Sequence, residues 1–146
     1  MNAIDSGIGY ELSETYPVSA ERLFQALTNA AVLKDIWRVQ QIEVDARVGG
    51  QTTAVFMTDG QDWSFTITYS EIVPNQRLEW TTHFKAFPAK VTRVVVAIDE
   101  AERGSTLVIR MGNFETLDER DANREAWRAG LARLGDILGQ RIEQRV

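Results

Sequence analysis

The chain has 146 residues, of which 44% are hydrophobic and 25% are charged, as is typical of one globular domain with a substantial core. Its net charge of −5 disfavours binding to nucleic acid or to anionic lipid. The absence of cysteine excludes disulfides, thiolate metal sites and a cysteine nucleophile. No apolar stretch approaches the roughly 20 residues that span a bilayer, and the N-terminus lacks a signal-peptide pattern. We therefore expect a single cytoplasmic domain, residues 1–146, with no nucleic-acid partner and no membrane span.

The N-terminal third of the chain predicts one strand and two short helices. Mixed polar and apolar residues at 8–18, with a proline near the end, indicate a strand that stops there. Ser19 then offers a helix cap, and apolar residues follow at helical spacing until Thr28 or Asn29. The same spacing predicts a second helix over Ala30–Trp37.

Beyond these helices the apolar period changes to about two and remains so for roughly seventy residues, which predicts a sheet. The predicted strands cover residues 42–48, 52–58, 63–70, 78–84, 91–98 and 105–111. Ile72 falls out of phase with the third of these strands, so a β-bulge is expected near Glu71. Turn residues predict connections at 49–50, 59–60, 74–75, 87–89 and 99–104.

A long amphipathic helix is predicted at the C-terminal end, over residues 118–145. Thr116 and Glu119 fit a capping box at its start. A helix with one apolar face is unstable alone and has to cover another surface. Four residues form the apolar stripe: Trp127, Leu131, Leu134 and Leu138.

The order of these elements is β-α-α-β6-α. Short links between the later strands favour antiparallel neighbours. We therefore predict an α+β fold, in which a curved antiparallel sheet packs on the long C-terminal helix.

Four sequence strings, in this order and spacing, resemble the START-like (SRPBCC, helix-grip) superfamily. Within it the chain is similar to the branch that includes the C-terminal domain of the activator of heat-shock protein 90 ATPase. The strings are LTNAAVLKDIW at 27–37, VDARVGG at 44–50, EIVPNQRLEW at 71–80 and GSTLVI at 104–109, followed by Trp127, Leu131 and Leu134.

The resemblance implies a sheet wrapped around the C-terminal helix, often with an apolar cavity between them. Members of the superfamily bind lipids, hormones or polyketides, some catalyse cyclisation or hydrolysis, and others act on chaperones. Relatives often carry a glycine before the helical tryptophan and paired aromatics at the end of the second helix. This chain instead has Ala126 and a single Trp37 followed by Arg38, and these positions shape the mouth of the pocket.

Residues for catalysis or metal binding are scarce. His83 is the one histidine, which makes a two-histidine metal site impossible. Strand alternation places His83 opposite Trp80, on the solvent face, together with Arg93 and Arg110 on their strands. The clustered carboxylates lie in a predicted hairpin and in the first turn of the last helix, where they suit the helix dipole. We therefore predict no catalytic residue, metal or cofactor.

Aromatic side chains on the predicted inner face mark the candidate binding site. They either fill the core or line a cavity for a flat, apolar ligand. Gly130 leaves room either for a close backbone approach or for that ligand. The candidate ligand-binding residues are Trp37, Trp63, Phe65, Tyr69, Trp80, Phe84, Met111, Trp127, Gly130, Leu131 and Leu134.

Three functions compete at this point. The first is binding of an apolar or aromatic small molecule, and the second is regulation of a chaperone through an outer apolar patch or charged groove. The third is a cyclase-like or hydrolase-like enzyme, which would need Tyr69, Arg93 or His83 to point inward. Valines on the outer face of the last two strands (Val91, Val95 and Val108) are compatible with a homodimer.

Overall fold

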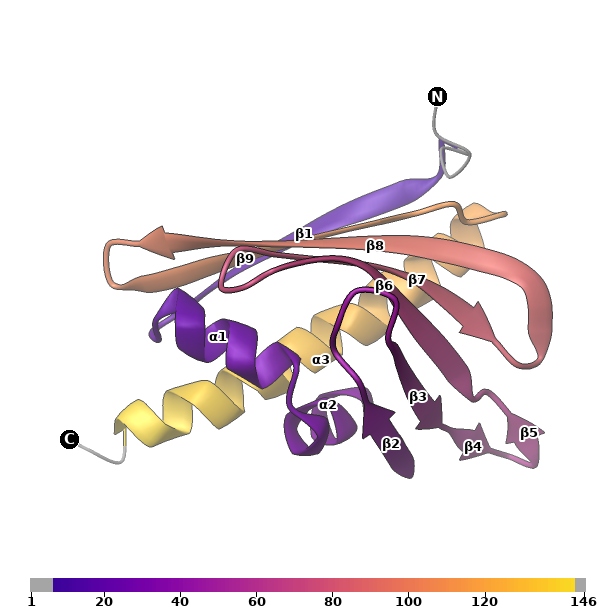
Figure 1. Ribbon diagram of the computed structural model, residues 1–146. Coiled ribbons are helices and arrows are strands. Elements are labelled where there is room, and N and C mark those ends of the chain that lie inside the picture. Colours follow the sequence, from indigo (N-terminus) through magenta and orange to yellow (C-terminus); the bar gives the residue numbers. More distant parts are fainter. Residues whose placement is uncertain (1–6, 144–146) are drawn as a thin grey trace.

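A curved, seven-stranded antiparallel sheet wraps around the long helix α3 (Leu117–Glu143), as Figure 1 shows. The computed structural model describes residues 7–143, except for the side chains of residues 87–90 and 140–143. The strands of this sheet, in spatial order, are β1 (Gly9–Tyr16), β9 (Gly104–Gly112), β8 (Phe87–Ala101), β7 (Arg77–Phe84), β6 (Phe65–Val73), β3 (Gln51–Val55) and β2 (Gln41–Val44). This arrangement confirms the predicted α+β helix-grip fold, including six strands of the main sheet after the helix pair.

Two capped helices connect β1 to β2, as predicted. In α1 (Ala20–Leu27) the Ser19 hydroxyl accepts a hydrogen bond from the Arg22 N–H at 3.2 Å. The Asn29 side chain caps α2 (Ala30–Trp37) in the same way, through the Val32 N–H at 3.0 Å. Because an N-cap residue has extended backbone geometry, a second cap at residue 29 requires two helices rather than one.

The sheet contains the predicted bulge and departs from three other predictions. The register between β6 and β7 shifts between Tyr69 and Glu71. The strand predicted over 42–48 ends at Val44, because the chain turns before β3 and Val48 is exposed. The strand predicted over 52–58 is interrupted, because Met57–Thr58 (β4) leaves the sheet and pairs with Gln61–Asp62 (β5) in a separate ribbon. The predicted loop at 87–89 is wrong: Phe87 pairs with Phe84, so the chain reverses between them and residues 87–89 begin β8.

The core lies between the concave face of the sheet and the three helices. Leu78, Val94, Leu107 and Ile109 supply fully buried side chains from the sheet. The helices contribute Leu23, Leu33, Ile36, Leu131, Leu134 and Leu138. The three buried leucines of α3 lie in its C-terminal half, so this half anchors the helix to the sheet.

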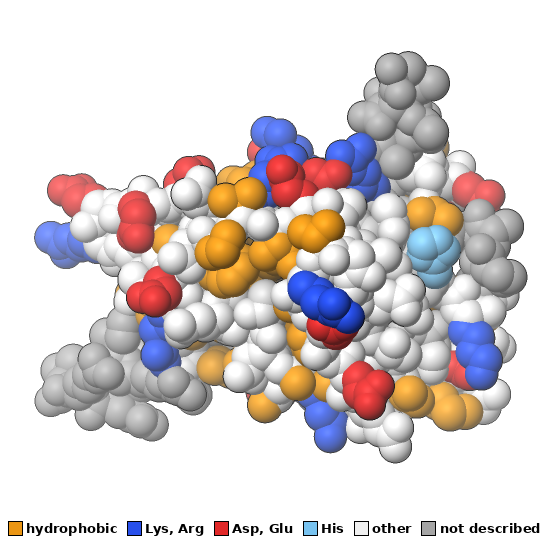
Figure 2. Space-filling view, in the orientation of Figure 1, with side chains coloured by type: hydrophobic (Ala, Val, Ile, Leu, Met, Phe, Trp, Pro, Cys, Tyr) orange, Lys and Arg blue, Asp and Glu red, His pale blue; other side chains and the backbone are white. Residues whose placement is uncertain are grey.

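Charged residues form a network on the convex face of the sheet. The Glu79 side chain is only 11% exposed and accepts hydrogen bonds from Arg77 Nη2 at 3.1 Å and from Arg93. Arg77 also binds Glu71 at 2.5 Å. On the face seen in Figure 2, apolar side chains are gathered at the centre and charged side chains of both signs lie around them.

Replacing Glu79 with glutamine should lower the free energy of unfolding by about 1–2 kcal/mol, because the poorly hydrated carboxylate that binds both Arg77 and Arg93 would lose its charge. Urea unfolding measures the change. Glu11→Gln is the matched control, since the Glu11–Arg110 pair is 54% and 71% exposed. Equal losses in the two variants would contradict a special role for the Glu79 network.

Candidate functional site

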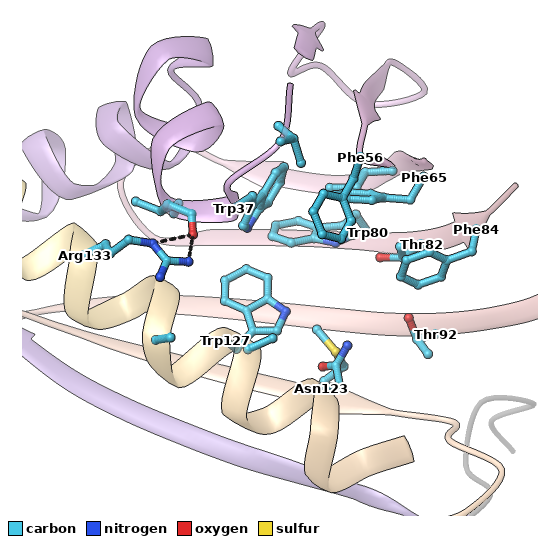
Figure 3. A pocket seen from close by; sticks show the side chains of 16 residues that line it. Trp37, Phe56, Phe65, Trp80, Thr82, Phe84, Thr92, Asn123, Trp127 and Arg133 are labelled. Carbon is cyan, nitrogen blue, oxygen red and sulfur yellow. Dashed lines mark hydrogen bonds between the residues drawn. The ribbon is translucent and has the colours of Figure 1, made fainter. Parts of the chain in front are cut away.

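A two-lobed groove lies between the N-terminal half of α3 and the concave face of the sheet. Figure 3 shows the inner of the two lobes. The inner lobe has a volume of about 290 Å³ and the outer lobe about 540 Å³. The two lobes adjoin each other, because they share six lining residues: Phe56, Thr82, Phe84, Thr92, Asn123 and Ala126. We call this shared segment the waist of the groove. A groove of this size takes a drug-sized molecule.

Aromatic rings form the wall of the inner lobe. Trp127 of α3 contacts Trp37 of α2 edge-on, with ring centroids 6.1 Å apart and an interplanar angle of 82°. It also lies 6.4 Å from Trp80 of β7. Phe65 contacts Trp37 at 5.5 Å and Phe84 at 5.6 Å, which extends the wall to the waist. Such rings offer large, rigid apolar surfaces to a flat ligand.

Small side chains on α3 keep the opposite wall open. Ala122, Ala126 and Ala129 line the groove and are exposed, although they lie on the same helix as the buried leucines. Their spacing of four and three residues places them on one side of the helix. A larger side chain at these positions would occupy the groove, so its width depends on alanine.

Neutral polar groups gather at the waist. Thr82 and Thr92 are direct cross-strand partners on β7 and β8, and Asn123 faces them from α3 (Figure 3). The Asn123 side-chain oxygen accepts a hydrogen bond from the Tyr10 hydroxyl at 2.5 Å. Burial raises the pKa of Tyr10, so its hydroxyl stays protonated and can donate. Met111 Sδ lies 3.5 Å from the same hydroxyl.

The two charged residues in the lining are engaged within the chain. Arg133 donates hydrogen bonds from Nε, at 3.1 Å, and from Nη2 to the Ile36 carbonyl at the end of α2. Glu119 accepts from the Glu115 N–H at 3.1 Å, while the Glu119 N–H donates to Thr116. The Arg133 hydrogen bonds hold α2 against α3. The hydrogen bonds of Glu119 cap the start of α3, where a capping box was predicted.

The structure brings most of the predicted aromatic residues to the groove. Trp63, which precedes β6 instead of belonging to it, lines the outer lobe. The residues in the inner lobe are Trp37, Phe65, Trp80, Phe84, Met111 and Trp127. The remaining four, Tyr69, Gly130, Leu131 and Leu134, are buried in packing outside both linings.

Gly130 has a packing role. A Cβ atom at this position would lie 3.2 Å from the Ile36 carbonyl oxygen, which is the same oxygen that Arg133 binds. The helices α2 and α3 therefore approach closely at Gly130. Of the two roles left open by the sequence, close backbone approach is the one observed.

The predicted ligand-binding residues did not include the waist residues Phe56, Thr82, Thr92 and Asn123. Phe56 lies in the break between β3 and β4, where its N–H donates to Ser64 Oγ at 3.3 Å. Thr92 could have been found from its register opposite Thr82, but that register depends on where β8 starts. Asn123 precedes Trp127 by one helical turn, a spacing that places both on the same side of α3.

The side chains that could have supported catalysis point elsewhere. His83 and Arg93 lie on the convex face, as predicted, and Arg93 pairs with Glu79. Tyr69 points inward, but its hydroxyl lies 2.6 Å from the Thr52 hydroxyl, to which it is hydrogen-bonded. Within the described residues, no three acidic or histidine side chains come together as a metal site, and no helix is long and apolar enough to cross a membrane.

The curved sheet, the long C-terminal helix and the groove between them define a START-like, helix-grip protein. Residues 17–139 match the family described as activator of Hsp90 ATPase homolog 1-like protein, and the chain belongs to this family. No curated protein matches the chain.

Solved structures with the same fold are numerous. Protein CV1439 from Chromobacterium violaceum is 22% identical with a TM-score of 0.79, over 89% of this chain and 96% of that one. Protein NE0264 from Nitrosomonas europaea is 22% identical with a TM-score of 0.76, over 96% and 99%. DynU16, from the dynemicin biosynthetic locus, is 16% identical with a TM-score of 0.75, over 90% of this chain and 47% of that one. At these identities the similarity establishes the fold.

Proposed function

We propose that the protein binds an apolar or aromatic small molecule in the groove between α3 and the sheet. The observation that carries this proposal is the aromatic-lined groove on the concave face of the sheet. Elsewhere packed apolar side chains cover this face. Membership of a START-like family supports a ligand-binding role in general. Trp37, Phe65, Trp80, Phe84 and Trp127 provide the apolar contacts, and Met111 forms part of the wall.

Native mass spectrometry of the purified protein tests this proposal. We expect a mass above that of the bare chain, which falls to the chain mass after extraction with an organic solvent. The emptied protein should then bind the neutral dye Nile red, with increased dye emission and quenched tryptophan fluorescence. A bare mass together with an unchanged dye spectrum would argue against a ligand-binding groove.

Regulation of an Hsp90-type chaperone is the second candidate function. It is favoured by the family description and by the convex face, where the Glu79 network adjoins the partly buried Val95 and Val108. We expect a chaperone contact there to change the rate of ATP turnover by an Hsp90 homologue. The Glu79→Gln variant should weaken this effect, whereas an unchanged turnover rate with the wild-type protein would remove this candidate.

The same convex valines motivate the proposal of a homodimer in the cytoplasm. Val91, Val95 and Val108 are only partly buried in the single chain, and a second copy would cover them. The native mass spectrum reports this assembly directly: a mass of one chain at micromolar concentration would contradict it.

A further inference from the structure

The hydrogen-bonding groups at the waist define the chemistry of the ligand more narrowly than the aromatic wall does. Thr82 and Thr92 lie opposite each other on the sheet, and Asn123 faces them from the helix, so three neutral polar side chains surround one short segment of the groove. Figure 3 shows the three side chains turned into the same space. Both lobes on either side of this segment are predominantly apolar.

The contact with Tyr10 determines which end of the Asn123 amide faces the groove. Because the Tyr10 hydroxyl donates to the Asn123 oxygen, the amide nitrogen, with its two N–H donors, is the end left for another partner. Within the described residues, the bond from Tyr10 is the only hydrogen bond of the Asn123 side chain, and no hydrogen bond joins either threonine hydroxyl to another residue. The waist therefore offers the two Asn123 N–H donors, together with two threonine hydroxyls that can donate or accept.

The charged residues near the groove disfavour an anionic ligand. Arg133 already donates two hydrogen bonds to the Ile36 carbonyl, so it is not positioned as a clamp for an anion. Glu119 carries a negative charge at the outer lobe and is held by the Glu115 N–H. A carboxylate or phosphate ligand would find repulsion at Glu119 and no arginine fork at the waist.

We infer that the groove selects an uncharged, flat aromatic molecule with a hydrogen-bond acceptor such as a ketone or quinone oxygen near its middle. The rings occupy the two apolar lobes, and the acceptor receives hydrogen bonds from the Asn123 amide and a threonine hydroxyl. This inference rests on the proposed function. It goes further than that function, because an apolar groove without these polar groups would bind a plain hydrocarbon as well as a ketone of the same shape.

A matched pair of probes tests the inference: 9-fluorenone and fluorene, which differ by a carbonyl in place of a CH₂ group. Quenching of tryptophan fluorescence measures both dissociation constants. We expect fluorenone to bind roughly five- to tenfold more tightly, the difference that one or two net hydrogen bonds supply. Equal affinities would overturn the inference while supporting the proposed function, and binding of neither probe would overturn both.

Two variants test whether the waist residues cause the preference for fluorenone over fluorene. Asn123→Asp keeps the shape and the bond from Tyr10 but replaces the N–H donors with an acceptor, so the preference for fluorenone should fall to about one. The double variant Thr82→Val/Thr92→Val should reduce the preference for fluorenone over fluorene about threefold. Thr81→Val is the control, because Thr81 is on the same strand but on the opposite face of the sheet. An undiminished preference in Asn123→Asp, with the melting temperature preserved, would refute the assignment.

Discussion

Replacement of Ala126 by tryptophan should weaken Nile red binding by roughly tenfold or more, because the indole ring would occupy the waist that both lobes share. Ala126 is exposed and contributes no buried side chain to the core. The variant should therefore keep its melting temperature within about 2 °C, since exposed helix positions tolerate substitution at a cost of about 0.5 kcal/mol. Dye titration and a thermal melt measure the two quantities.

Ala132→Trp is the matched control for this variant. Ala132 is on the same helix and is also exposed, but it lies outside both lobes of the groove. Its affinity for Nile red should equal that of the wild type. Equal dye binding in Ala126→Trp and the wild type would place the dye outside the groove and count against the proposed site.

Replacement of Gly130 by valine should destabilise the fold by about 3 kcal/mol, since a branched side chain would collide with the Ile36 carbonyl. The backbone oxygen cannot move away without loss of its hydrogen bonds from Arg133. For a chain of this length the melting temperature should fall by roughly 6–12 °C. Differential scanning calorimetry measures this shift.

Gly139→Ala is a control variant whose stability should change in the opposite direction. A Cβ atom at Gly139 meets no neighbour within 4 Å, so the alanine should stabilise the helix by up to about 1 kcal/mol. A similar loss of stability in both glycine variants would show that helix propensity, not the contact with Ile36, governs Gly130.

The alternation of apolar and polar residues predicted the fold well, because each strand buries the side chains on one face and exposes those on the other. The cap at Ser19 and the interruption at Thr28 or Asn29 predicted two helices, and the phase change at Ile72 predicted the bulge. The start of β8 was mispredicted because Pro88 suggested a break. A proline lacks a backbone donor but is tolerated at the beginning of a strand, which is where Pro88 lies.

The groove was only half predictable from the sequence. Its aromatic wall follows from alternation along β6 and β7, because bulky apolar residues belong on the inner face. Its alanine wall does not, since alanine is common in both buried and exposed helix positions and gives no sign of which one it occupies. Gly130 was ambiguous for a related reason: a missing side chain indicates space but not what fills it.

The unequal packing of α3 has an evolutionary consequence. Leu131, Leu134 and Leu138 bind the helix to the core, whereas Ala122 and Ala126, at the other end, contact mainly the open groove. Mutations at the alanine end can reshape the site at little cost in stability, so they are accessible one at a time. A single scaffold can thus acquire new ligands by drift along the first half of one helix, while selection for folding acts on the second half.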